Sequence, residues 1–306
     1  MGGLIKYFLI IFFIANASSQ DKLFTILDPD QTGIHFSNDL IDNKENNVFL
    51  YANFYGGAGV GVGDFDNDGL DDLFFAGNLV DDKIYKNLGN LKFQDKTPSS
   101  GIVNDNSWST GVTVADVNND GLLDIYVSCE LYDDQPKLRT NKLYINKGNF
   151  KFDELAAKWN VDVDRRTRHA VFFDYNKDGL LDLYLLNHPP NTGNFSPFLG
   201  TDMKLPEYNL QLFENKEGFF EDVTAKAGLD RSGFPNAAVI GDFNKDGWPD
   251  IYVANDFEAP DFLYYNNQDG TFEYKTESSL RHTSFYSMGV DAADINNDSH
   301  LDLMVL

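Results

Sequence analysis

Short apolar runs recur along the chain and are separated by polar segments of similar composition. Such runs occupy residues 59–63, 73–77, 109–115, 125–129, 169–173, 183–187, 251–255 and 303–306. They are rich in Val, Ile, Phe and Tyr, which favour strands, and only residues 152–160 and 221–229 have a brief helical pattern. The pattern therefore predicts an all-β chain.

A second signature follows four of these strand pairs. It has an apolar-aromatic pair, an Asn two residues further on, then a Gly and a Phe, and it occurs in residues 82–95, 141–154, 210–222 and 261–274. An Asn and Gly region between two aromatic runs predicts a hairpin. We therefore predict that each unit contains a strand, a polar loop, a second strand and a hairpin, about four strands in all.

Four-stranded units that repeat in sequence indicate the blades of a β-propeller. A solenoid is the rival interpretation, but its repeats are shorter than about 50 residues unless they are helical. We therefore predict a β-propeller of four-stranded blades, with about five blades present in this chain.

The polar segment inside each unit is acidic and repeats at fixed offsets. Residues 64–72 read DFDNDGLDD, and similar segments begin at 116, 174, 242 and 294, at spacings of 52, 58, 68 and 52 residues. Each copy has Asp at position 1, Asp or Asn at position 3, and Asp at positions 5 and 9. Carboxylates about 5 Å apart repel each other by roughly 1 kcal/mol in water. A bound cation explains the recurrence better than a solvated turn does.

Calcium is the cation that fits these loops best. It takes about six to eight oxygen ligands, whereas zinc prefers His or Cys and magnesium keeps more water. An EF-hand, which opens with the same DxDxDG sequence, needs a bidentate Glu at position 12, where all five copies have an apolar residue. The predicted ligands of up to five Ca²⁺ ions are the side chains at positions 1, 3, 5 and 9 and the backbone carbonyl at position 7. They are Asp64, Asp66, Asp68, Leu70 and Asp72 in the first loop; Asp116, Asn118, Asp120, Leu122 and Asp124 in the second; Asp174, Asn176, Asp178, Leu180 and Asp182 in the third; Asp242, Asn244, Asp246, Trp248 and Asp250 in the fourth; and Asp294, Asn296, Asp298, His300 and Asp302 in the fifth.

Composition narrows the class of protein further. The 306 residues carry a formal charge of −24, which argues against a nucleic-acid partner, and 42% of them are hydrophobic, enough for a large core. Cys129 is the only cysteine, so no intramolecular disulfide forms. Residues 1–19 have one Lys, a short apolar run and small residues at its end, which predicts a cleaved secretory signal rather than a membrane span. The repeat domain then covers residues 20–306.

The acidic loops and their flanks resemble the FG-GAP or VCBS repeats that form the blades of integrin α-subunit propellers. Residues 59–78, 141–152, 221–229 and 287–298 resemble more narrowly the secreted cartilage-acidic-protein-like family, which often carries an ASPIC/UnbV domain. This resemblance covers essentially residues 21–306 and implies that the loops bind calcium at blade edges. Two features depart from it: Ser299 and His300 replace the usual Gly and apolar residue, and no ASPIC/UnbV segment is present.

The fifth unit ends at Leu306, just after its loop and second strand. Family propellers have seven or eight blades, and a propeller needs its last blade to close on its first. We therefore expect an N-terminal fragment or truncated gene product that forms an open, incomplete arc.

Other residues give weaker signals. Arg165, Arg166 and Arg168 form the only dense basic cluster, read as a solvated turn or as a contact for an anion or partner. The insertion at residues 187–209, with Phe195, Phe198 and Tyr208, is the first candidate for a partner contact.

The five histidines are scattered and match no catalytic motif, so no catalytic residue and no organic cofactor is predicted. The sequence predicts a non-enzymatic, secreted or periplasmic or cell-surface calcium-binding scaffold for adhesion to an unidentified protein or glycan. The alternative is the propeller module of a polysaccharide-acting enzyme, whose signature would be paired acids or a His, Tyr and Arg set on the central channel.

Overall fold

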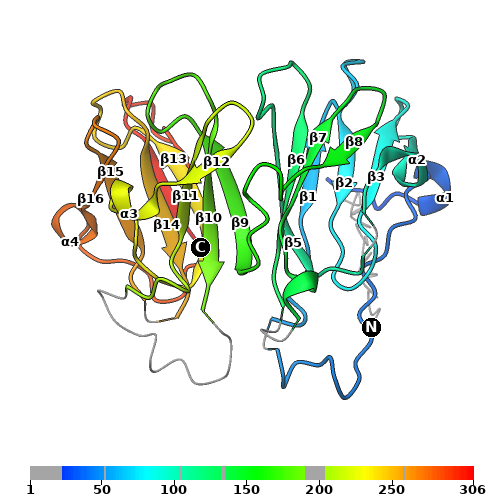
Figure 1. The fold of residues 1–306 in the computed structure, drawn as a ribbon, viewed down its shortest axis with the longest axis horizontal. Coiled ribbons are helices and arrows are strands. Elements are labelled where there is room, and N and C mark those ends of the chain that lie inside the picture. Colours follow the sequence, from blue (N-terminus) through cyan, green and yellow to red (C-terminus); the bar gives the residue numbers. More distant parts are fainter. Residues whose placement is uncertain (1–22, 52, 104, 132–134, 190–203, 258) are drawn as a thin grey trace, which may run out of the picture.

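A computed structural model describes residues 23–51, 53–103, 105–131, 135–189, 204–257 and 259–306. The predicted signal at residues 1–19, and Phe195 and Phe198 of the insertion, lie outside these described residues. Strands dominate the described part of the chain (Figure 1). The all-β prediction is confirmed.

Four antiparallel sheets of four strands and one of two strands follow each other along the chain. The first sheet contains β1 (Val60–Gly63), β2 (Asp72–Phe75), β3 (Lys83–Asn87) and β4 (Phe93–Asp95); the second β5 (Ser109–Ala115), β6 (Asp124–Cys129), β7 (Lys142–Asn146) and β8 (Phe152–Glu154); the third β9 (Arg166–Phe173), β10 (Asp182–His188), β11 (Gln211–Asn215) and β12 (Phe220–Asp222); the fourth β13 (Pro235–Gly241), β14 (Asp250–Asn255), β15 (Phe262–Asn266) and β16 (Phe272–Tyr274); and the last β17 (Val290–Ala293) and β18 (Asp302–Val305).

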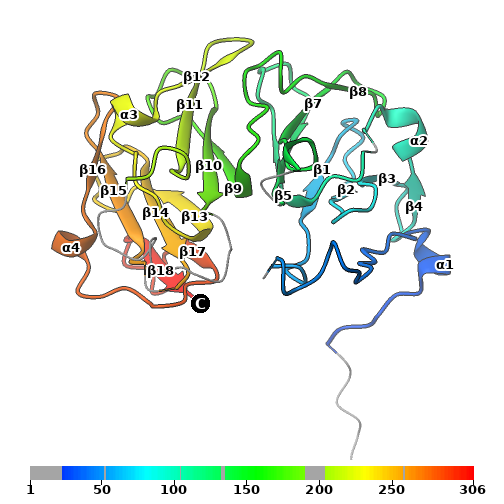
Figure 2. The ribbon, with the colours of Figure 1, turned by 60° about the horizontal axis from the view of Figure 1, so that its bottom comes forward.

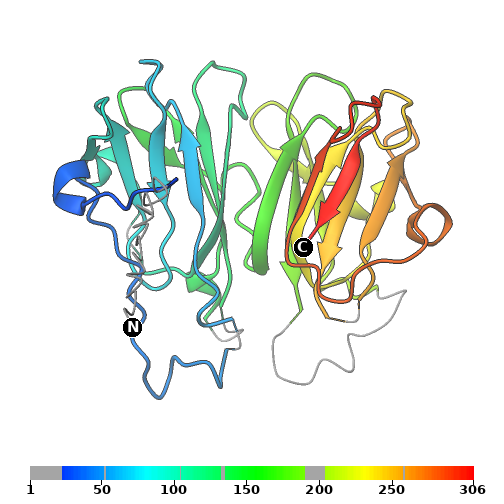
Figure 3. The same cartoon turned by 180° about the vertical axis from the view of Figure 1, so that it is seen from behind.

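Every four-stranded sheet keeps its strands in sequence order, and the first strand of one sheet packs on the first strand of the next. The sheets therefore form an arc of propeller blades with β1, β5, β9, β13 and β17 innermost. Figure 2 shows the blades in chain order from the cyan first sheet to the red β17 and β18. From behind, the red pair lies against the fourth sheet (Figure 3).

The hydrophobic core lies between the blades. One cluster joins the first and second sheets around Phe74 and Tyr144, another joins the second and third around Tyr126 and Leu183, and a third joins the third and fourth. Strands β6, β10 and β14 are buried along their whole length because blades cover both of their faces. This explains why they are continuously apolar in sequence rather than alternating.

Glycines let the innermost strands approach each other closely. A Cβ on Gly59 would lie 2.8 Å from the carbonyl oxygen of Thr110, and one on Gly61 would lie 2.6 Å from Val112. The hydroxyl of Thr113 in β5 also donates a hydrogen bond of 2.7 Å to the carbonyl of Ala170 in β9. Gly59 and Gly61 therefore allow β1 to pack closely against β5.

Helices are short and lie in the segments that connect strands or precede the first sheet. They are α1 (Pro29–Thr32), α2 (Thr97–Ser100), α3 (Thr224–Ala227), α4 (Thr276–Ser279) and one 3₁₀ turn, η1 (Pro136–Leu138). The helical pattern of residues 221–229 thus yields only α3, and residues 152–160 form β8 followed by a turn. Among the described residues, none of these helices has the length and hydrophobicity that a membrane span requires.

Candidate metal centre

The five acidic loops each join the first strand of a sheet to the second, so they all lie at one edge of the arc. In the first loop the carboxylate of Asp64 accepts hydrogen bonds from the backbone N–H groups of Asp68, at 3.0 Å, and Gly69, at 2.7 Å. The carboxylate of Asp68 then accepts one from the N–H of Leu70 at 3.0 Å. The other four loops repeat all three bonds at the same positions.

Positions 4 and 6 of each loop have a left-handed backbone. Gly69 at position 6 has φ 88°, and a Cβ there would meet open space. In the fifth loop Ser299 takes φ 65° at this position and its N–H still donates a bond of 2.8 Å to Asp294. The replacement of Gly by Ser therefore leaves the loop fold intact and adds backbone strain.

The carboxylate at position 9 has a different environment from the others. Asp124 is buried and accepts bonds from the N–H groups of Val117, at 3.0 Å, and Asn146, at 2.8 Å. Burial raises the pKa of Asp124 to about 7, although these two bonds act to lower it. Asp72, Asp182 and Asp250 make the same pair of bonds. Position 9 thus fastens each of these loops to the hairpin of its own blade.

Three carboxylates lie close together in the first loop. Ligand atoms of Asp64, Asp66 and Asp72 lie within 4.8 Å of one another. The Oδ1 atom of Asp66 is buried, and no described residue donates a hydrogen bond to it. The other Asp66 oxygen and Asp68 bind the ammonium group of Lys86, which lies 2.7 Å from Asp68. The donor set is entirely oxygen, which suits calcium.

The second to fourth loops have Asn at position 3 in place of Asp66. The amide group of Asn118 donates a bond of 2.9 Å to the Asp120 carboxylate, and its carbonyl oxygen accepts one of 3.0 Å from the N–H of Asp120. Asn176 and Asn244 make the same contacts with Asp178 and Asp246. Sequence positions 3 and 5 therefore lie next to each other in each of these loops.

Two kinds of hydrogen bond that the sequence analysis missed join each of the first three loops to the next blade. The position-4 side chain of one loop reaches the position-6 carbonyl of the following loop: Asn67 donates to Gly121 at 3.0 Å, Asn119 to Gly179 at 3.2 Å, and Lys177 to Gly247 at 2.6 Å.

In the opposite direction, the hairpin Asn of one blade reaches the position-2 carbonyl of the preceding loop. Asn146 donates to Phe65 at 2.8 Å, Asn215 to Val117 at 3.0 Å, and Asn266 to Tyr175 at 2.8 Å. The fixed Asn in the hairpin signature was the sequence signal for these bonds.

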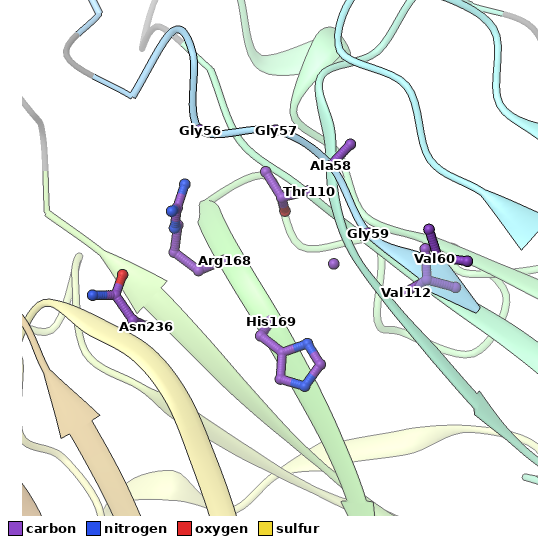
Figure 4. Close-up of a pocket in the computed structure, with 11 residues that line it drawn as sticks. Gly56, Gly57, Ala58, Gly59, Val60, Thr110, Val112, Arg168, His169 and Asn236 are labelled. Atoms are coloured by element: carbon purple, nitrogen blue, oxygen red, sulfur yellow. The ribbon is translucent and has the colours of Figure 1, made fainter. Parts of the chain in front are cut away.

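A cavity of about 310 Å³ lies on the inner side of the arc, at the start of the innermost strands (Figure 4). Its polar lining includes Arg168, His169 and Asn236. The Arg168 guanidinium lies 2.5 Å from the buried carboxylate of Glu130, and burial lowers the pKa of His169. None of the described residues that line this cavity is an acid.

A second cavity, of about 290 Å³, opens beside the start of β9. It is lined by Arg139, Asp164, Arg165, Arg166, His188, Glu207 and Tyr208. Arg166 and Arg168 lie within strand β9, so the interpretation of the basic cluster as a solvated turn is wrong for these two residues. Cys129 is buried at the end of β6, and burial raises the pKa of its thiol to about 12.

The profile of the FG-GAP-like repeat family matches residues 40–127 and 242–305, and the chain is an FG-GAP-like repeat protein. It is similar to cartilage acidic protein 1 of Xenopus tropicalis, with 22% identity over 80% of this chain and 36% of that protein. It is also similar to phosphatidylinositol-glycan-specific phospholipase D of Bos taurus, with 28% identity over 43% of this chain and 17% of that protein. Integrin alpha pat-2 of Caenorhabditis briggsae shares 25% identity over 65% of this chain and 18% of its own length.

The chain spans about a third or less of the length of these curated relatives. Among solved structures it is similar to a lectin of Agrocybe aegerita, with a TM-score of 0.48 and 17% identity, over 80% of this chain and 59% of the lectin.

Proposed function

We propose that this chain is a secreted or cell-envelope calcium-binding β-propeller that acts as an adhesion or interaction scaffold for a protein or glycan. One observation carries the metal assignment: five loops share one hydrogen-bonding pattern, and the loop with the most carboxylates has a buried Asp66 oxygen with no donor among the described residues. An unpaired buried oxygen is costly, and a cation would remove that cost.

The ligands in this proposal are the carboxylate or amide oxygens at positions 1, 3 and 5, the carbonyl oxygen at position 7, and a remaining lone pair at position 9. Bound calcium would supply positive charge to a chain whose formal charge is −24. Because the loops are hydrogen-bonded to neighbouring blades, metal in one loop also holds the adjacent blade in place. A rigid edge of this kind suits a scaffold that binds partners outside the cell, where free calcium is high.

Calcium binding is tested by native mass spectrometry and by thermal unfolding in EDTA and in 2 mM CaCl₂. We expect bound calcium, up to five ions, and a rise in Tm of about 5 °C or more at saturation. Asp120→Asn should reduce the number of bound ions by one, whereas Asp153→Asn, an equal charge change at an exposed strand position, should not. Equal Tm values in EDTA and calcium, with no bound ion, would reject the metal assignment.

A propeller module of a polysaccharide-acting enzyme is the second candidate function. The cavity beside β9 brings two acids, Asp164 and Glu207, together with Tyr208 and His188, which is the kind of set expected of such a site. Incubation with neutral and acidic polysaccharides, followed by analysis of chain length, separates the two functions. Shorter chains would support the enzyme, and binding without shortening would support the scaffold.

A further inference from the structure

The cavity beside β9 lies at the edge of the arc opposite the acidic loops. Strand β9 runs from Arg166 toward the third acidic loop, and β10 returns from that loop to His188. The two ends that line the cavity are paired with each other, because Arg166 and His188 are register partners. The cavity therefore belongs to a different surface from the proposed calcium sites.

Arg165 is a half-buried cation without an ion-pair partner in this cavity. Its guanidinium donates to Asn209, at 2.7 Å to the side-chain oxygen and 3.3 Å to the backbone carbonyl. Within the described part of the chain, no carboxylate comes within 4 Å of it. Burial lowers the pKa of Arg165, while the more distant carboxylates of Asp222, Asp164 and Glu207 act in the opposite direction, so the guanidinium is partly desolvated without a direct ion pair.

Positive charge is concentrated here in a strongly acidic protein. Three of the six arginines of the chain, Arg139, Arg165 and Arg166, line this cavity. Two acids, Asp164 and Glu207, also line it, and both are exposed. His188 is neutral, because burial and the nearby Arg168 and Arg166 lower its pKa to about 3. These three arginines meet at one cavity of a chain whose formal charge is −24.

The mixture of groups indicates the chemistry of the ligand. A guanidinium binds a carboxylate through two parallel N–H bonds, which favours Arg for planar anions. Exposed Asp164 and Glu207 can accept bonds from hydroxyl groups, and half-buried Tyr208 offers an aromatic face. The cavity volume of about 290 Å³ lies near the lower end of the range for small-molecule sites, about 300 to 1,000 Å³, so it admits one sugar ring rather than a long chain segment.

We propose that this cavity binds a uronic acid residue of an acidic glycan, with Arg165 contacting the sugar carboxylate and Tyr208 packing against the ring. This inference rests on the scaffold function proposed above, since it names the ligand class, but not on the calcium assignment.

The test measures binding of methyl β-D-glucuronide by isothermal titration calorimetry, with methyl β-D-glucoside as the neutral probe of the same size. Both titrations use the whole chain in 2 mM CaCl₂. We expect heat of binding for the glucuronide, at least tenfold weaker binding of the glucoside, and weaker glucuronide binding at higher salt. Glucose 6-sulfate is the third probe, and we expect it to bind less tightly than the glucuronide because its anion is tetrahedral rather than planar.

Arg165→Gln should weaken glucuronide binding at least tenfold and Arg165→Lys by less, because Lys keeps the charge but loses the planar fork. Arg281→Gln is the matched control, an equal charge change at an exposed arginine, and should bind within twofold of the unaltered chain. If Arg165→Gln does not fold, Tyr208→Ala tests the same cavity.

Equal binding of glucuronide and glucoside, absence of glucuronide binding, tighter binding of the sulfate, or equal losses in the Arg165 and Arg281 variants would each overturn the proposal. A separate thermal scan in EDTA reports on calcium. A failure of the metal assignment is therefore distinguished from a failure of the uronate site.

Discussion

The side chain of Asn67 donates a hydrogen bond of 3.0 Å to the backbone carbonyl of Gly121, 54 residues away in the next blade. Asn119 repeats this bond toward Gly179, and Lys177 repeats it toward Gly247. The acidic loops are thus joined in a row along one edge of the arc. The row predicts that loop residues outside the metal ligands contribute to the stability of the interfaces between blades.

Asn67→Ala should lower the free energy of unfolding by about 1 kcal/mol through loss of this bond. Asn67 has a left-handed backbone, with φ 58°, which Ala adopts less readily than Asn. The control variant must therefore replace an Asn that has the same backbone conformation. Asn297 occupies the same position in the fifth loop with φ 60° and makes no side-chain bond to any described residue. Urea unfolding of Asn67→Ala and Asn297→Ala in EDTA isolates the bond, and equal destabilisation by both would contradict its role.

Positions 5 and 9 of one loop should respond differently to the same substitution. Asp124→Asn should lower the free energy of unfolding by about 1 to 3 kcal/mol even in EDTA, because its new NH₂ group would face the N–H of Val117 or Asn146. Asp120→Asn should leave stability in EDTA nearly unchanged, since Asp120 is exposed, and should reduce the gain in Tm that calcium gives. Thermal unfolding with and without calcium checks both.

Asp250→Asn, at position 9 of the fourth loop, provides the replicate because Asp250 accepts the same two backbone bonds. A position-9 variant that loses stability in calcium but not in EDTA would show that its main role is metal ligation.

Lys86 forms ion pairs with two carboxylates of the first loop, Asp66 and Asp68. Partial burial of Lys86 lowers the pKa of its ammonium group. Bonds to Asp66 and Asp68 outweigh this effect and hold the pKa well above its ordinary value, so the group stays charged. Lys86→Met should therefore lower stability in EDTA, because Asp66 and Asp68 then repel each other. It should also raise the affinity of the first loop for calcium, because the competing ammonium is gone.

Calcium titration calorimetry on Lys86→Met and on Lys83→Met measures this effect. Lys83 lies on the same strand but forms a looser ion pair with Asp95, at 3.9 Å, outside the loop. Unchanged or weaker calcium binding in Lys86→Met would exclude competition by the ammonium.

The strands and the repeated positions of the acidic loops could be predicted from the sequence, because both depend on residues that are close together in the chain. The run at residues 109–115 became β5 with the same bounds, and position 1 of every loop binds the N–H groups of positions 5 and 6, since these contacts need only a tight turn. The four-stranded blade followed from the hairpin signature in the same way.

Contacts between repeats could not be derived from spacing within one repeat. Asn146 and Phe65 are 81 residues apart, and their bond depends on how one blade docks on another. The cavity beside β9 brings Arg139, Arg165 and Glu207 together from two blades for the same reason. The sequence also did not show that the Asp residues at positions 5 and 9 have different environments. Burial of Asp124 and exposure of Asp120 are properties of the packed sheet.

Acid should destabilise the protein through His188, whose buried imidazole lies at the end of β10 against the start of β13. Its Nε2–H donates a bond of 3.0 Å to the carbonyl of Pro235, and its ring packs edge-on against Phe234. Burial, with Arg168 and Arg166 nearby, lowers its pKa to about 3, against about 6.5 in the unfolded chain. Because the unfolded chain binds the extra proton first, this stability is present above pH 6.5 and is lost as pH falls toward 3, by about 2 kcal/mol at pH 5.

His188→Gln removes this titration and keeps a donor that can reach Pro235. Urea unfolding in EDTA at pH 7 and pH 5 measures how acidification changes the free energy of unfolding. For His188→Gln this free energy should fall less, or rise more, than for the unaltered chain. Buried carboxylates such as Asp124, whose burial raises their pKa, stabilise the chain as pH falls, but they are present in both proteins and cancel in the difference. His282→Gln, at an exposed histidine, should match the unaltered chain, and an equal pH response in His188→Gln would show that His188 is not the acid-sensitive group.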